Sequence, residues 1–333
     1  MTVVRGGADP SLAAVITRVT PLRYAAGADP ALDRPSHVRA GSGIAWIGGV
    51  LAVVQDDAAF IALIDPRTGE VHSIPLPADD GVRQFGTERG NKERKADLES
   101  CVVLPAADGG EVLAAFGSGS TPARERIVLV RGIPHAPRVE VHHAPRFYAG
   151  LRAAYEFSGS EMNVEGAAWD GGELILVNRG NGAAVDGREP VDATCRIHWP
   201  ALLDHLRGGS EPPAPASIVR YELGEVDGWR LGFTDAAAFG TRILFTAAAE
   251  ASPNTYDDGP VAGSVLGVLE AERARWALLR GADGTPFDGK VEGVAPGREQ
   301  GTALLVVDRD DPHRPSDLCL VELRGNWPVS INE

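Results

Sequence analysis

One pattern recurs five times along the chain and limits the folds that it can adopt. Each copy has a small or acidic residue, a short apolar strand, a Gly-containing turn, a second apolar strand and a polar tail. The copies begin at Ser42, Glu99, Glu165, Asp235 and Glu292, at intervals of 57, 66, 70 and 57 positions. A supersecondary unit repeated at such intervals is typical of folds in which each unit packs against its neighbours.

The intervals leave room for four strands and a loop in each unit. Two further runs of strand composition follow each of the first four pairs, whereas only LCLVELRG follows the fifth. The N-terminal segment AAVITRVTPLRY can supply the missing strand, and a strand donated in this way leaves no open sheet edge. We therefore predict an all-β fold, a single β-propeller domain over residues 1–333 with five blades, closed by an N-terminal strand at about residues 12–25.

Two other folds remain open. Six blades are the alternative if an insertion hides a weak blade. A β-sandwich with many hairpins is the rival fold, but it gives no reason for an acidic residue to recur at the start of the units.

Turn residues and insertions fit the same organisation. The 40 Gly and 24 Pro residues are explained as punctuation between short strands. Insertions are predicted at about residues 77–96 and 180–215. One short helix is predicted in the second insertion, where apolar side chains follow the i, i+3, i+4, i+7 rule at Trp199, Leu202, Leu203 and Leu206.

The charge balance restricts the partners. The chain has 46 acidic residues against 32 Lys and Arg, a net charge of −14. Nucleic acid and anionic membranes require a basic surface, so neither is expected as a general partner. The first residues lack a long apolar segment with a cleavage site, and no run of about 18 apolar residues occurs. We therefore expect a cytoplasmic protein, and its oligomeric state is left open.

The acidic residues of the repeat predict a metal site. The first strand of each propeller blade lines the central channel, so Glu99, Glu165, Asp235 and Glu292 should point toward the axis. Four carboxylates around one channel repel each other unless some are protonated or a cation lies among them. Converging oxygen ligands are what Ca²⁺ prefers, although another divalent cation would also fit. Alternatively, these acids only pair with nearby bases, namely Lys95, Lys290, Arg179 and Arg309.

Loops that leave the second strand of each unit should meet on one rim. Their polar residues are Gln55, Asp56, Asp57, Ser118, Ser120, Arg124, Arg126, Asn178, Arg179, Asn181, Glu250, Asn254, Tyr256, Asp257, Asp308, Arg309 and Asp310. Asn178 and Asp308 are candidate metal ligands among them. Gly-rich turns expose N–H groups and arginine binds anions in bidentate fashion, which makes Lys95, Ser118, Arg124 and Lys290 candidates for holding a small anionic substrate. A flexible turn and a solvated basic surface are the alternative interpretation.

Three segments resemble a known family. KADLES followed by GSGST, NVEGAAW followed by LILVNRGN, and KVEGVAP followed by LLVVDRDD resemble bacterial propellers of the esterase-like phytase group and their uncharacterised relatives. The E-G-x-x-W strand is more distantly similar to gluconolactonase and senescence-marker propellers. The resemblance covers about residues 40–325 and implies a calcium-supported hydrolase of a phosphate ester or lactone. It carries Glu99, Glu165 and Glu292 over as axial acids, with Asn178 and Asp308 as further ligands.

Taken together, these observations favour a metal-dependent hydrolase. Glu99 or Glu292 would act as the general base, and Arg179, Arg309 or Lys95 would hold the substrate anion. A non-catalytic propeller that binds a ligand or partner is the alternative, and a lactonase-type isomerase or lyase is the third hypothesis. The chain departs from the family pattern at Asp235-Ala, which stands in place of Glu-Gly, and it lacks the secretion signal of a phytate scavenger.

Overall fold

The computed structural model describes residues 2–250 and 261–328, and 20 of the 22 strands in these ranges form five groups of four. The first group contains β3 (Gly41–Ile47), β4 (Val50–Gln55), β5 (Phe60–Ile64) and β6 (Val71–Pro75). The second contains β7 (Leu98–Pro105), β8 (Glu111–Gly117), β9 (Arg126–Arg131) and β10 (Arg138–His143). The third contains β11 (Val164–Trp169), β12 (Leu174–Asn178), β13 (Asp192–Ile197) and β14 (Ala216–Glu222).

The last two groups follow the same antiparallel order. The fourth contains β16 (Trp229–Phe239), β17 (Arg242–Glu250), β18 (Val261–Leu269) and β19 (Arg273–Gly281), with the short β15 (Glu225–Val226) paired to the start of β16. The fifth contains β20 (Lys290–Pro296), β21 (Thr302–Asp308), β22 (Asp317–Gly325) and β2 (Leu12–Pro21). Each group thus starts at one of the five repeats in the sequence.

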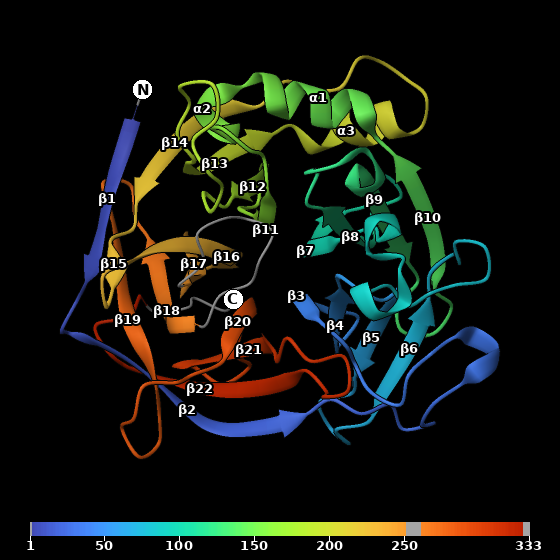
Figure 1. The fold of residues 1–333 in the computed structure, drawn as a ribbon, viewed down its shortest axis with the longest axis horizontal. Coiled ribbons are helices and arrows are strands. Elements are labelled where there is room, and N and C mark those ends of the chain that lie inside the picture. The colour runs from blue at the N-terminus through green and yellow to red at the C-terminus, as the bar shows by residue number, and fades with distance from the viewer. Residues whose placement is uncertain (1, 251–260, 329–333) are drawn as a thin grey trace.

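The first strands of the groups stand in a closed ring. β3 packs beside β7, β7 beside β11, β11 beside β16, β16 beside β20, and β20 again beside β3 (Figure 1). Buried apolar side chains form five clusters, each between two successive groups; the last one joins Val306 of β21 to Val53 of β4. The core is therefore a circle of sheet-to-sheet interfaces, which is the arrangement of a β-propeller.

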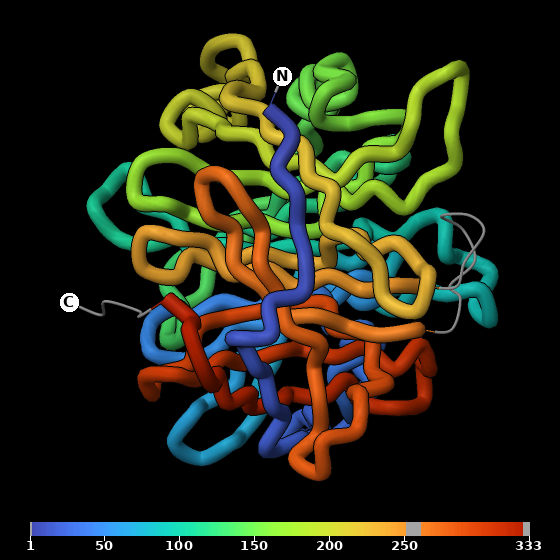
Figure 2. Tube along the Cα trace, turned by 90° about the vertical axis from the view of Figure 1, so that its left-hand side faces the viewer, coloured from blue at the N-terminus to red at the C-terminus, as the bar shows by residue number. Residues whose placement is uncertain are grey.

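The N-terminal segment contributes two strands to the outside of this ring. β2 pairs antiparallel with β22 and, at its start, parallel with β19. β1 (Thr2–Ala8), which the sequence did not predict, lies parallel between β14 and β19 and so joins the third group to the fourth. Figure 2 shows this segment crossing the outside of the molecule. As a result, the last three groups form one 14-stranded sheet.

The three α-helices that the structure describes lie at the outer edge of the ring, near the second and third groups (Figure 1). α3 (Trp199–Leu206) occupies the predicted helix and buries Trp199, Leu202 and Leu203. The expectation of only one helix is wrong, because α1 (Pro145–Ala153) and α2 (Tyr155–Ser158) precede β11. Single 3₁₀ turns occur at η1 (Pro30–Leu32), η2 (Thr87–Arg89), η3 (Lys92–Arg94) and η4 (Pro122–Arg124). None of the helices in the described ranges is long and apolar enough to cross a membrane.

Candidate functional site

A β-bulge aims the acidic side chains of three inner strands. In β7, β11 and β20 the register with the neighbouring strand shifts by one residue, and the unpaired residues are Glu99, Glu165 and Glu292. A bulge bends the strand and redirects the side chain of the extra residue. All three acids line one cavity of about 1170 Å³, here called the axial cavity, whose wall also includes Lys95 and Asp308.

In β11 and β20 the residue after the bulge contacts the next inner strand. A Cβ atom on Gly166 would lie 2.9 Å from the backbone nitrogen of Ala236, and one on Gly293 would lie 2.4 Å from the carbonyl oxygen of Ser42. Real Cβ atoms do not approach backbone this closely, so glycine is required at both places. The repeated Glu-Gly pair therefore combines a side chain that faces the cavity with a backbone that packs tightly.

Asp235 does not share this arrangement. In β16 the unpaired residue is Thr234, so Asp235 takes the place that glycine has in β11 and β20. The carboxylate of Asp235 accepts a hydrogen bond from the backbone N–H of Val294 at 2.8 Å, and burial raises the pKa of Asp235 well above its usual value. Asp235 does not line the axial cavity, so the structure places it apart from the other predicted ligands.

Most of the cavity acids on the β11 and β20 side are paired with bases. Arg179, whose side chain is 4% exposed, lies 3.5 Å from Glu165 Oε1 and 2.8 Å from Glu250 Oε1. The Nζ atom of Lys290 lies 2.9 Å from Glu292 Oε1 and 3.4 Å from Glu250 Oε1. Burial raises the pKa of Glu165 to about 8 and also raises that of Glu292, against the effect of these bases. In this part of the wall Arg179 and Lys290 each lie between two carboxyl groups.

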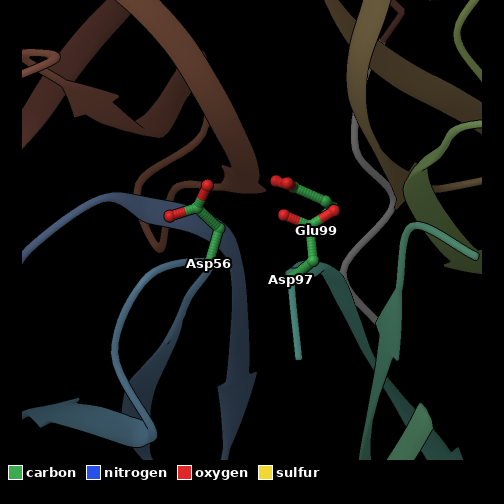
Figure 3. Close-up of side chains that lie close together, drawn as sticks. All are labelled: Asp56, Asp97 and Glu99. Carbon is green, nitrogen blue, oxygen red and sulfur yellow. The ribbon is translucent and has the colours of Figure 1, made fainter. Parts of the chain in front are cut away.

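A carboxylate cluster of Asp56, Asp97 and Glu99 lies on the other side of the cavity. One oxygen from each residue lies within 4.8 Å of the other two, and Figure 3 shows the three side chains facing one space. Lys95 Nζ lies 2.7 Å from Asp56 Oδ2 and 2.5 Å from Asp97 Oδ1. Arg124 contributes a further contact, 2.9 Å from Asp97 Oδ2.

Glu99 is the member of this cluster that contacts no base within the described residues, although the charge of Lys95 acts on it. It accepts no hydrogen bond from the residues that the structure describes, and burial together with Asp97 and Asp56 raises its pKa well above the usual value. Asp56 Oδ1 is buried and also lacks a hydrogen-bond partner within residues 2–250 and 261–328. An orphaned buried oxygen beside an unpaired carboxylate is what a hard cation would satisfy, so the cluster fits a divalent metal.

The structure places the other predicted site residues as follows. Asp308 lines the cavity, and burial together with Asp310 raises its pKa well above the usual value. Ser118 is buried behind the wall, where its hydroxyl donates to Asp97. Asn178 Oδ1 accepts from the backbone N–H of Asn163 at 2.8 Å, so this amide braces the backbone. Arg309 donates to Asp317 at 2.7 Å and does not line the cavity.

Sequence reasoning missed Asp97 and treated Asp56 and Glu250 only as rim residues. Asp97 lies two positions before Glu99, so a second acid beside the first residue of the unit was visible in KADLES. No spacing rule could relate Asp56 to them, because it follows a strand of a different group. Asn254, Tyr256 and Asp257 of the predicted rim lie outside the described residues.

Comparisons with known proteins complete the description. The model of a family of unknown function (DUF6929) matches residues 37–323. No curated protein sequence matches the chain. A luciferin-regenerating enzyme is similar in structure, with 9% identity and a TM-score of 0.45 over 94% of this chain and 96% of the other.

Two further solved structures are similarly distant. A calcium-binding regucalcin from Agrobacterium tumefaciens has 10% identity and a TM-score of 0.40 over 99% of both chains. The Malassezia sympodialis allergen Mala s 1 has 13% identity and a TM-score of 0.44 over 85% of this chain and 92% of the other. Similarities this distant leave the function to be argued from the chain's own residues.

Proposed function

The chain belongs to a family of unknown function, DUF6929, and we propose that it is a divalent-cation-dependent hydrolase of a phosphate ester, lactone or other ester. The carboxylate cluster is the observation that carries this proposal. Its three carboxylates, the Lys95 ammonium and the Arg124 guanidinium leave a net charge of −1 when all are ionised, and this remaining negative charge favours a cation. Calcium is the favoured ion, because carboxylate oxygens and water are its preferred ligands.

Cation binding and the general base are assigned to different residues of the cavity. Glu99 and Asp56 would hold the cation, since each has an oxygen without a hydrogen-bond partner among the described residues. When bound, a divalent cation polarises a phosphoryl or acyl oxygen and lowers the pKa of a bound water. Glu292, whose pKa is raised by burial, is the candidate general base, with Lys290 2.9 Å away to orient it.

Fewer residues are proposed to bind the substrate anion than the sequence suggested. Arg124 lines the cavity beside the cluster and remains a candidate for contacting the substrate. Lys95 is held between Asp56 and Asp97, so it orients these acids. Arg179 is held between Glu165 and Glu250, so its role is to orient these acids. Arg309 is given no role, because it donates to Asp317 away from the cavity.

A calcium titration of thermal stability tests the metal. A ligand that binds only the folded state stabilises it by about 2.7 kcal/mol at 100 times its Kd. We expect the wild-type melting temperature to rise at millimolar calcium, and the Glu99→Gln variant to lose this rise while still folding. Glu111→Gln, at an exposed position at the start of β8, is the matched control and should respond like the wild type. An equal response of Glu99→Gln and wild type contradicts the site.

Turnover tests the chemistry separately. With p-nitrophenyl phosphate and a δ-lactone as probes, we expect calcium-dependent hydrolysis by the wild type. The Glu292→Gln variant should keep the calcium-induced rise in melting temperature and lose hydrolysis. Retained hydrolysis in Glu292→Gln rules this residue out as the base.

A non-catalytic binding propeller is the second candidate. Arg179 and Lys290 are paired with Glu165, Glu250 and Glu292. Acids held by such ion pairs can shape a cavity that binds a ligand without taking part in a reaction, and this favours the second candidate. Calcium binding without turnover of either probe would support this candidate.

Three broader parts of the proposal rest on the sequence. We propose that the five strand groups are the five blades of the propeller, which agrees with the five repeats. The resemblance to esterase-like phytases favours a small anionic substrate. The excess of 14 negative charges favours neither nucleic acid nor an anionic membrane as partner, and the expected compartment is the cytoplasm.

A further inference from the structure

Arg188 differs from the other arginines of the axial cavity. Among the described residues six arginines line the cavity, and five of them contact a carboxylate: Arg39, Arg89, Arg124, Arg152 and Arg179. Arg188 has an exposed side chain and forms no ion pair with any residue in the described ranges. Its positive charge on the cavity wall is therefore available to a ligand.

The backbone of Arg188 is fixed by a tight hairpin. Val185 and Arg188 exchange two backbone hydrogen bonds, of 3.0 and 2.9 Å. Between them, Asp186 and Gly187 have φ angles of 50° and 73°. Positive φ at both central residues, with the sequence Asp-Gly, is typical of a type I′ turn, which holds a hairpin in one register.

The guanidinium group is fixed as well. Its carbon atom lies 3.5 Å from the centre of the Tyr155 ring, in a cation–π contact. Tyr155 begins α2, and its carbonyl oxygen accepts a hydrogen bond of 2.9 Å from Arg220. An arginine stacked on a ring keeps its N–H donors in the plane of the group and free to bind an anion.

The end of α2 docks against the same hairpin. The backbone N–H of Ser160 donates to the backbone carbonyl oxygen of Glu189 at 3.0 Å. A Cβ atom on Gly159 would lie 2.7 Å from the same carbonyl oxygen. Ser160 also lines the cavity, and its hydroxyl oxygen is buried without a hydrogen-bond partner in the described part of the chain. The wall here thus combines a guanidinium without an ion pair among the described residues and, beneath the surface, a hydroxyl group without a hydrogen-bond partner there.

We propose that Arg188, stacked on Tyr155, and the Ser160 hydroxyl form a subsite for an oxyanion of the ligand, a phosphate or carboxylate group. This inference rests on the proposed function, because it assigns an anionic group to the substrate of the same cavity. Arg188 makes bidentate hydrogen bonds to the oxyanion, and Ser160 donates a further one. The substrate class is then an ester that carries an anionic group apart from the bond that is hydrolysed.

Anion titration in EDTA tests this subsite without any metal. The probes are inorganic phosphate and acetate, measured by calorimetry on the wild type and on Arg188→Gln, Arg188→Lys and Arg138→Gln. Arg138 is the matched control, since it is an exposed arginine in β10 outside the cavity. We expect binding to Arg188→Gln to be weaker by about tenfold or more, as for the loss of charge-assisted hydrogen bonds. The affinity of Arg188→Lys should lie between those of the wild type and Arg188→Gln, and the affinity of Arg138→Gln should equal that of the wild type.

The outcomes separate this proposal from the calcium proposal. Equal affinity in Arg188→Gln and wild type, with both folded by thermal melting, overturns the subsite, as does wild-type protein that binds neither probe. Tighter binding of phosphate or of acetate identifies which oxyanion the substrate carries. The anion titration contains no divalent cation, so its result does not depend on the calcium site. If Arg188 binds the anion but calcium does not raise the melting temperature, the anion subsite stands, and the hydrolase proposal and the ester substrate fall.

Discussion

Arg179 contacts two carboxylates whose protonation differs. Burial raises the pKa of Glu165 to about 8, while Arg179 and Lys290 overcome burial and lower the pKa of Glu250 to about 2. Glu165 receives a hydrogen bond of 2.6 Å from Asn163, and its distance to Arg179 is 3.5 Å, longer than the 2.8 Å from Arg179 to Glu250. The closer acid thus stays ionised while the more distant one holds a proton near neutral pH.

This difference predicts how stability depends on pH. The raised pKa of Glu165 means that the folded state binds more protons than the unfolded state, so the stability from this group is present at low pH and is lost as pH rises toward 8. Gln cannot ionise, yet it keeps an oxygen for Asn163. Without divalent cations, the unfolding free energy of the wild type should therefore fall relative to Glu165→Gln by up to about 1.4 kcal/mol per pH unit between about pH 5 and 8.

Urea unfolding at several pH values measures this difference. Glu111→Gln, which replaces an exposed carboxyl group, should follow the wild type at every pH. If the Glu165→Gln curve also runs parallel to the wild type, Glu165 is ionised throughout this range and the argument from burial fails.

The sequence predicted the position of three acids that the repeat aligns, while their roles stay predictions. Glu99, Glu165 and Glu292 line the cavity because each begins its unit in the same way and occupies a bulge. Asp235 was aligned with them, but a bulge one residue earlier moves it to the glycine position. Arg188 lies in an insertion that has no counterpart in other units, so no pattern could mark it.

At the scale of the element, the two N-terminal strands differ in whether the sequence repeat could predict them. β2 was predicted from a missing strand in the fifth unit, and it pairs with β22. β1 was not predicted, because its partners β14 and β19 lie more than 200 positions away and belong to different groups. Both groups already have four strands, so the repeat pattern gave no sign that a further strand would pair with them.

Two substitutions within β2 test its contribution to the core. Ile16 is 5% exposed in the cluster between the fourth and fifth groups, whereas Val19 is 44% exposed in the same strand. Removing a buried aliphatic side chain costs its transfer energy and leaves a cavity, so Ile16→Ala should lower the unfolding free energy by about 2–4 kcal/mol. Val19→Ala should change it by less than about 0.5 kcal/mol. Urea unfolding that gives equal losses for both would show that β2 does not close the fifth group in solution.

At the scale of the whole molecule, stability depends on a closed circle. Each of the five apolar clusters lies between two neighbouring groups, and the cluster around Val306 and Val53 joins the last group to the first. A sheet removed from the ring would expose apolar surface on both faces. The repeat in the sequence predicts such units, but the order of their contacts is a property of the assembled ring.

This circle predicts that weakening one interface destabilises every group. Val306 is fully buried, so Val306→Ala should cost roughly 1–3 kcal/mol. Because the slowest amides exchange through global opening, hydrogen exchange should show the same loss of protection in β4, β8, β12, β17 and β21. Val141→Ala, at a 39% exposed position in β10, should leave all five unchanged. Loss of protection confined to β4 and β21 would mean that the groups open independently and that the ring is not one cooperative unit.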